Sequence, residues 1–200
     1  MSLRPATFFL ITYLLGNTAH ELCFDISLFN SKSYRLYDFV RSLIAHRENT
    51  TLLVYEPTIK YARFPPMDLH PEDIEVFGEP LRRDHREVFD ILKWLRKAKR
   101  VDSIIELKVP DRLVNPHNEE EIGEIVKKFG VEVLDWRFLD LSLSVFADVR
   151  SQIRSLHLYA SGKRAVINHW MGEQGLATFT ELASLHIHIV QVSLFLRRGI

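Results

Sequence analysis

The stretch Ile153-Arg-Ser-Leu-His-Leu158 is followed 29 residues later by Leu182-Ala-Ser-Leu-His-Ile187. Both stretches fit the pattern apolar-x-x-apolar-x-apolar, and both carry Ser-Leu-His at the same place. The residues between them are compatible with a helix. Repetition at this spacing predicts stacked strand–helix units and therefore an α/β fold with parallel strands.

The same rhythm extends toward the N-terminus. We expect strands at residues 101–109, 131–136, 153–159 and 182–190, centred near residues 106, 134, 157 and 187. Asn118 and Gly130 are suited to cap the two ends of a helix between the first two strands. The sequence thus predicts repeated strand–helix units that form a mainly parallel sheet. A solenoid of the leucine-rich-repeat kind is the alternative, although the asparagine ladder typical of those repeats is missing.

The N-terminal part is less regular. Apolar spacing predicts a helix over residues 34–46, and a short apolar run predicts a strand over 52–55. Residues 56–84 are rich in proline and acidic residues and are expected to form an irregular connection. We therefore divide the chain into an N-terminal segment with this connection (residues 1–80), an α/β repeat module (81–191) and an atypical tail (192–200).

Composition limits the possible partners. The 200 residues contain 26 Lys and Arg and 26 Asp and Glu, so the formal charge is zero and gives no general attraction to nucleic acid. No segment has the ~20 consecutive apolar residues that span a bilayer. Cys23 is the only cysteine, which favours a reducing, cytoplasmic location. Secretion through a signal peptide at residues 1–19 is the alternative.

Histidines stand at equivalent places in the two repeated stretches. His157 and His186 are expected to point to the same face of neighbouring parallel strands, with His188 two residues further on. Two or three imidazoles on one face could bind zinc or copper, but the two strands offer no accompanying carboxylate or cysteine. We therefore predict no metal site and no cofactor. Instead, His157, Tyr159, His186 and His188 are candidates for a face that binds a protein partner.

A second candidate site follows the first repeated stretch. Ser161, Lys163 and Arg164 lie between an expected strand and an expected helix, where anions often bind, and Arg137 could contribute to the same site. The Gly162-Lys163 pair does not complete a phosphate loop, because His157 stands where a glycine is needed and Arg164 where Ser or Thr is needed. A small anion-binding hydrolase is the corresponding enzymatic alternative. It requires Asp111, Arg137, Ser161 and Lys163 to converge in one pocket.

Several phrases are similar to one protein family. They are Glu106-Leu-Lys-Val109, Asn115-Pro-His117, Val131-Glu-Val-Leu-Asp-Trp-Arg137, Leu156-His-Leu-Tyr-Ala-Ser-Gly162 and Leu185-His-Ile-His188. Together, over residues 85–190, they resemble the region just upstream of the peptidase domain in large filamentous-fungal proteins with a subtilisin-like serine protease domain.

This resemblance implies a protease context rather than activity in the chain itself. Subtilisin-like enzymes take Asp, His and Ser from the motifs Asp-[Ser/Thr]-Gly, His-Gly-Thr and Gly-Thr-Ser, and none of these occurs in the sequence. We therefore expect a non-catalytic module with a regulatory or protein-binding role, whose partner is another protein or a domain downstream in the same protein. A stand-alone protein-binding module of the leucine-rich-repeat type is the alternative.

Overall fold

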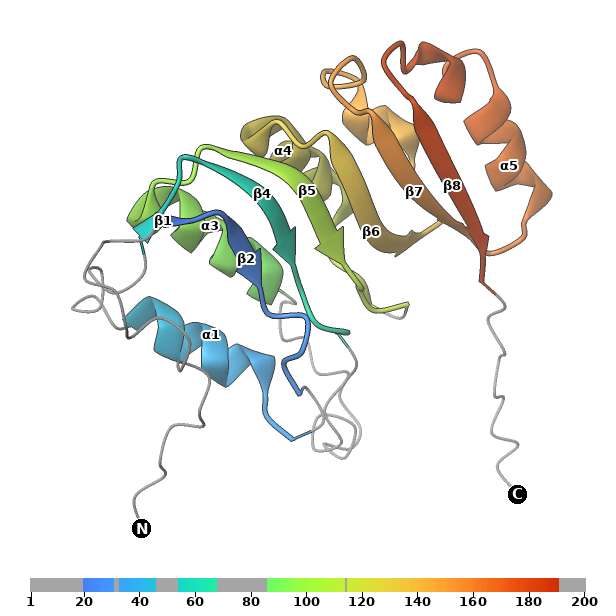
Figure 1. Ribbon diagram of the computed structural model, residues 1–200. Helices are drawn as coiled ribbons and strands as arrows, with labels where there is room; N and C mark the ends of the chain where they lie inside the picture. The colour runs from blue at the N-terminus through green and yellow to red at the C-terminus, as the bar shows by residue number, and fades with distance from the viewer. Residues whose placement is uncertain (1–19, 31–32, 46–53, 68–85, 114, 191–200) are drawn as a thin grey trace, which may run out of the picture.

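The computed structural model describes residues 20–30, 33–45, 54–67, 86–113 and 115–190. The segment of the alternative signal peptide (1–19) and the expected tail (192–200) lie outside these ranges. A parallel sheet of six strands, in the order β2-β4-β5-β6-β7-β8, forms the centre of the fold, and a separate parallel pair joins β1 to β3 (Figure 1). The strands are β1 (His20–Glu21), β2 (Cys23–Asp25), β3 (Val54–Tyr55), β4 (Thr58–Arg63), β5 (Ser103–Val109), β6 (Val133–Leu139), β7 (Ser155–Ala160) and β8 (Ser184–Ile189).

The helices are α1 (Leu36–Ala45), α3 (Glu87–Lys99), α4 (Glu119–Phe129) and α5 (Arg164–Met171), with short 3₁₀ turns η2 (Leu143–Phe146) and η3 (Leu176–Thr178). The α/β fold with a mainly parallel sheet is thereby confirmed. The described strands form an open sheet, and they show neither a solenoid nor a closed barrel. Within the described ranges, no helix combines the length and the apolar character needed to cross a membrane.

Strand order decides where the helices lie. From β4 to β8 each strand pairs with the next strand along the chain. Parallel crossovers are right-handed, so a sheet built without a reversal of strand order receives its crossover helices on one face. Figure 1 shows α3 and α4 behind the sheet and α5 beyond β8. We call the opposite face of the sheet the open face.

The core lies between the sheet and these helices. Along β7, Leu156, Leu158 and Ala160 are buried, whereas the alternating residues Ser155, His157 and Tyr159 are only half-buried. The buried stripe of α3 and that of α4 belong to the same apolar cluster as the strands. Successive side chains of a strand point to opposite faces of the sheet. Alternation between buried and half-buried residues along β7 therefore indicates that one face is packed against the helices and the other is open.

One expectation about the N-terminal part is wrong. Residues 58–63 do not belong to an irregular connection but form β4, which pairs with β2 on one side and β5 on the other. Proline is excluded from the middle of a ladder, and Pro57 and Pro65 both fall just outside β4. The prolines of this region therefore mark the ends of a strand rather than its absence. The sheet consequently includes strands from both sides of residue 80.

Other local expectations are confirmed. The Asn118 side chain accepts a hydrogen bond from the Glu121 amide at the start of α4, and Gly130 ends that helix in the left-handed conformation with φ of 62°. α1 and β3 fall inside the ranges expected for them, although residues 52–53 lie outside the described part. The two repeated stretches pair in parallel with His157 opposite His186, so they occupy equivalent places in the sheet.

Candidate functional site: the open face of the sheet

One row of ionisable side chains crosses the whole open sheet. The registers place Asp25 opposite Arg63, Arg63 opposite Lys108, Lys108 opposite Asp135, Asp135 opposite His157 and His157 opposite His186. Residues in register on neighbouring strands point to the same face. The six strands thus contribute one ionisable residue each, and we call Asp25, Arg63, Lys108, Asp135, His157 and His186 the ionisable row.

Aromatic rings stack at the β7–β8 end of this row. The His157 ring lies 4.3 Å from that of His186 and 5.4 Å from that of His188, with interplanar angles of 19° and 12°. Tyr159 continues the series, with its ring centre 4.6 Å from that of His188. We call these four residues the histidine stack. The interaction-face residues expected from the sequence are therefore in mutual contact, whereas their role stays a prediction.

Asp135 links the histidine stack to the rest of the row. Its Oδ1 accepts a 2.6 Å hydrogen bond from the Tyr159 hydroxyl, and its Oδ2 lies 2.8 Å from Lys108 Nζ. Burial opposes ionisation of this carboxyl, but the hydrogen bonds from Lys108 and Tyr159 outweigh it and hold the pKa of Asp135 below its usual value. Burial, followed by the hydrogen bond to Asp135, raises the pKa of Tyr159. Asp135 is consequently a buried, paired anion.

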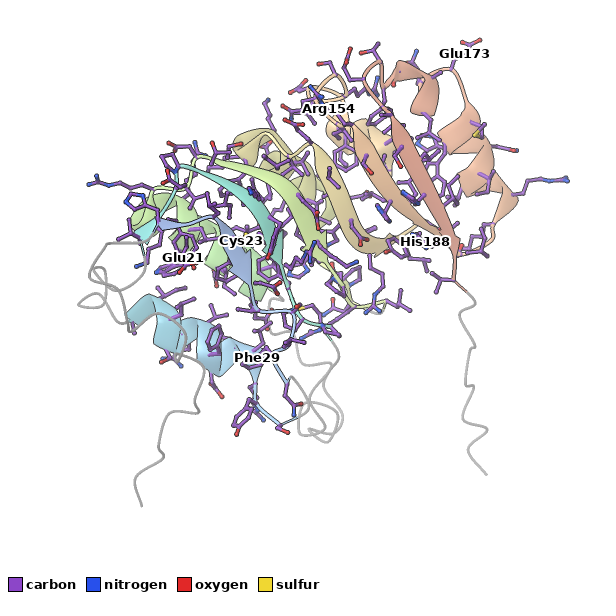
Figure 2. All side chains as sticks on the ribbon, viewed as in Figure 1. Glu21, Cys23, Phe29, Arg154, Glu173 and His188 are labelled. Carbon is purple, nitrogen blue, oxygen red and sulfur yellow. The ribbon has the colours of Figure 1, made fainter. Side chains whose placement is uncertain are left out.

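Within the stack, two rings share a hydrogen bond. His157 Nδ1 lies 3.2 Å from His188 Nε2, and a hydrogen bond here needs one protonated and one unprotonated nitrogen. Partial burial lowers the pKa of His157; Asp135 counteracts this effect, and the neighbouring His186, His188 and Lys108 add to it. His157 therefore favours the neutral form at neutral pH. Its neighbours His186 and His188 are exposed on β8, and His188 lies near the C-terminal end of that strand (Figure 2).

At the other end of the row, charges pair across strands. Arg63 lies 2.9 Å from Glu106, and its guanidinium also stacks over the Tyr61 ring at 4.3 Å. These side chains are partly exposed, so the ion pair adds little stability, but it fixes the orientation of the arginine. The open face therefore changes in character from paired charges over β4 and β5 to aromatic rings over β7 and β8.

The candidate anion site is divided between two places. Ser161 donates from its amide to Asp140 Oδ1 at 2.7 Å and from its hydroxyl to Asp140 Oδ2 at 2.6 Å, and Lys163 Nζ lies 3.9 Å from the same Oδ2. The carboxylate of Asp140 thus occupies both donors of Ser161, whereas the side chain of Lys163 is 74% exposed. Arg137 instead donates to the carbonyl oxygens of Asp111 and Pro110. Arg164 is exposed at the first turn of α5.

Asp111 belongs to a buried cluster. Its Oδ2 accepts hydrogen bonds from Trp136 Nε1 at 2.8 Å and from the His117 amide at 3.1 Å, and it lies 2.8 Å from His117 Nδ1. Asp111, His117 and Trp136 are each at most 2% exposed. The Asp111 carboxylate therefore faces the interior, whereas Ser161 binds Asp140 and Lys163 Nζ lies 3.9 Å from that carboxylate. The four residues of the hydrolase alternative do not share one set of contacts.

No group of three or more His, Cys, Asp or Glu among the described residues has an arrangement that could hold a metal ion. The histidine stack illustrates why, because its rings face one another rather than converging with their nitrogens on a point. The expectation that the protein needs no metal or cofactor stays a prediction.

Four members of the ionisable row were missed by sequence reasoning: Asp25, Arg63, Lys108 and Asp135. The sequence held a signal for Lys108. Side chains alternate between the two faces along Glu106-Leu-Lys-Val109, so Lys108 points away from the face on which Leu107 and Val109 are buried. Arg63 could not be placed without recognising β4.

The chain was compared with protein-family models, with curated proteins and with solved structures. None of these three comparisons found a match.

Proposed function

We propose that this chain is a non-catalytic α/β module that binds a protein partner on its open face. The observation that carries this proposal is a parallel sheet whose described helices cover one face. Parallel sheets are nearly always covered on both faces, so a face that no described helix covers, and that carries an ordered ionisable row, suits a second macromolecule. Aromatic rings of the histidine stack would supply contact area at low entropic cost, and paired charges would set orientation.

The polar groups near the open face are paired with one another, and this favours binding over catalysis. Asp135 is paired with Lys108 and Tyr159, and Ser161 is paired with Asp140. Asp140 accepts from both the amide and the hydroxyl of Ser161, a contact that fixes the chain at the end of β7, and the sequence lacks the three motifs of a subtilisin-like triad. The polar groups of the face are thus arranged for recognition.

The resemblance to fungal proteins with a subtilisin-like domain supports a regulatory context for this module. In that context the open face would bind either a target protein or a protease domain encoded downstream. Sequencing of the transcript beyond the Ile200 codon tests this point. A reading frame that continues into the Asp, His and Ser motifs supports the protease context, whereas a stop codon favours a stand-alone interaction module.

Because Cys23 is the only cysteine, we infer a cytoplasmic location.

A photo-crosslinking experiment tests the binding function. Peptides are selected from a random displayed library on the folded protein, and benzoylphenylalanine is placed either at His186, on the open face, or at His169, which is exposed on α5. We expect the selected peptides to cross-link from position 186 and not from position 169. We also expect replacement of Tyr159 by Ala to weaken their binding by about tenfold, or 1.4 kcal/mol. Cross-links confined to position 169 would refute the proposal.

A further inference from the structure

The charges around the histidine stack are unbalanced toward the cationic side. Lys108 comes from β5, Asp135 and Arg137 come from β6, and Tyr159 lies on β7 between the imidazoles. Among these described neighbours Asp135 is the single carboxylate, and both of its oxygens are engaged, by Tyr159 and by Lys108. A protonated His157 would have this already engaged carboxylate as its neighbour, with Nδ1 4.0 Å from Asp135 Oδ1, and His186 Nε2 lies 2.9 Å from the uncharged Ser184 hydroxyl.

Acid also removes the internal hydrogen bond of the stack. Histidine changes charge between about pH 5 and 8, within the physiological range. When His157 and His188 are both protonated, two N–H donors face each other across the 3.2 Å that now separates Nδ1 from Nε2. The Asp135 oxygen nearest to His157 already accepts from Tyr159, so an external acceptor beside the two rings would relieve the contact between their N–H groups. A carboxylate oxygen is the acceptor that also compensates the charge.

The geometry fits an extended peptide better than a compact anion. The ionisable residues from Lys108 to His186 lie on four adjacent strands, which spans about 14 Å at a strand spacing of about 4.8 Å. An extended chain covers that distance in about four residues. Exposure of His186 and His188 leaves their rings accessible from solvent. A ligand with several carboxylates along a short extended segment would reach Lys108 on β5 and the imidazoles on β7 and β8 at the same time.

We propose that the histidine stack is an acid-dependent binding site for a carboxylate-rich peptide segment. This inference rests on the proposed protein-binding function and adds to it the chemistry of the ligand and its regulation by pH. An acidic peptide binds the protonated stack more tightly than the neutral one, and by linkage its affinity rises as pH falls. The zero net charge of the chain argues against a general attraction to polyanions such as nucleic acid.

Binding of rhodamine-labelled hexaglutamate, followed by fluorescence anisotropy at pH 7.5 and 5.5, tests the inference. Hexaglutamate stays largely ionised at both values, because the pKa of Glu is about 4.3. We expect affinity to increase at least about tenfold from pH 7.5 to pH 5.5, because one imidazole of ordinary pKa, about 6.5, that stays protonated in the complex contributes a factor of about ten over this interval. Hexaglutamine serves as the uncharged control peptide. Amide chemical-shift changes on the unmodified protein should map to β7 and β8.

Matched variants locate the effect. Replacement of both exposed histidines, His186→Asn and His188→Asn, should abolish the pH dependence, whereas His169→Asn on α5 should retain it. Equal affinity at both pH values, no binding, or shift changes away from β7 and β8 would overturn the inference. Equimolar inorganic phosphate that competes fully would overturn it as well, since any small anion would then suffice.

Failure of the acid-dependent site can be distinguished from failure of the proposed protein-binding function. Library peptides that cross-link from position 186 with the same affinity at pH 7.5 and 5.5 would refute the acid-dependent site and leave the protein-binding function standing. Library peptides that cross-link only from position 169 would refute that function, whatever hexaglutamate does.

Discussion

Tyr159 is the residue through which the histidine stack is tied to the ionisable row, because its ring stacks on His188 and its hydroxyl donates to Asp135. A hydrogen bond to a buried carboxylate is worth about 1.5–3 kcal/mol. We expect Tyr159→Phe to lower the free energy of unfolding by about this amount at pH 7. Urea unfolding measures this change in the free energy of unfolding. The control is Tyr34→Phe, because Tyr34 is exposed on another part of the chain.

The same variant has a defined pH dependence. Because the pKa of Asp135 is lowered in the folded state, its ionisation stabilises the fold above the unfolded value of about 3.9, and this contribution is lost as pH falls through the folded value. The difference between the two proteins should therefore shrink when unfolding is repeated at pH 3. A loss of equal size at pH 7 and pH 3 would show that the contribution of the Tyr159 hydroxyl does not depend on the charge of Asp135.

Asp111 provides a second test at the residue scale. Replacement of Asp111 by Ala removes the acceptor for Trp136 Nε1 and the partner of His117 in a fully buried setting. Breaking a buried charged network costs about 3–5 kcal/mol, so we expect a loss of stability in that range. Asp148→Ala, at an exposed partner of Lys127, should have a much smaller effect. A variant with native stability would mean that Asp111 is available for another role.

At the scale of elements, the contact between α4 and η2 depends on one glycine. A Cβ at Gly123 would lie 2.4 Å from the carbonyl oxygen of Val145, closer than real contacts allow. Gly to Ala inside a helix normally stabilises by about 1 kcal/mol, but overpacking costs about 1–3 kcal/mol. We expect Gly123→Ala to lower the free energy of unfolding, measured by urea titration. Glu124→Ala, one residue further on an exposed side of α4, is the control; a stabilised Gly123→Ala variant would contradict the close contact.

Strand β8 carries apolar side chains on its helix-facing side without burying them. Leu185, Ile187 and Ile189 are 38%, 42% and 62% exposed, and among the described strands β8 pairs with β7 alone. Such an edge, which has no Lys, Arg, Asp, Glu or Pro and whose histidines are uncharged when neutral, favours pairing with another chain. We expect concentration-dependent association by analytical ultracentrifugation, weakened by Ile187→Lys. Met171→Lys, at an exposed apolar position on α5, should leave association unchanged; an effect of equal size would place the contact elsewhere.

At the scale of the whole molecule, the repeated Ser-Leu-His phrases were sufficient to predict a parallel α/β sheet, because equivalent places in two units become neighbours in register. They also placed His157 beside His186. The ionisable row could not be predicted, because it depends on registers between strands far apart in the sequence, from Asp25 to His186. β4 was not predicted because prolines lie close to both of its ends. The contacts of Asp111 with its buried partners were not predicted because no local sequence pattern indicates them. Long-range pairing, rather than local pattern, decides which polar residues meet.

That pairing also predicts how stability is distributed across the sheet. The central residues Ile104, Leu107, Leu134 and Leu156 are completely buried, whereas β8 is half-exposed or exposed throughout. Amides of a central strand exchange only when the whole domain opens, but those of an edge strand exchange through local opening. We expect native-state hydrogen exchange to give the slowest rates in β5 and β6 and much faster rates in β8. Equal protection of β8, lost on dilution or in Ile187→Lys, would mean that a second copy covers this edge. Equal protection at every concentration would contradict the open edge itself.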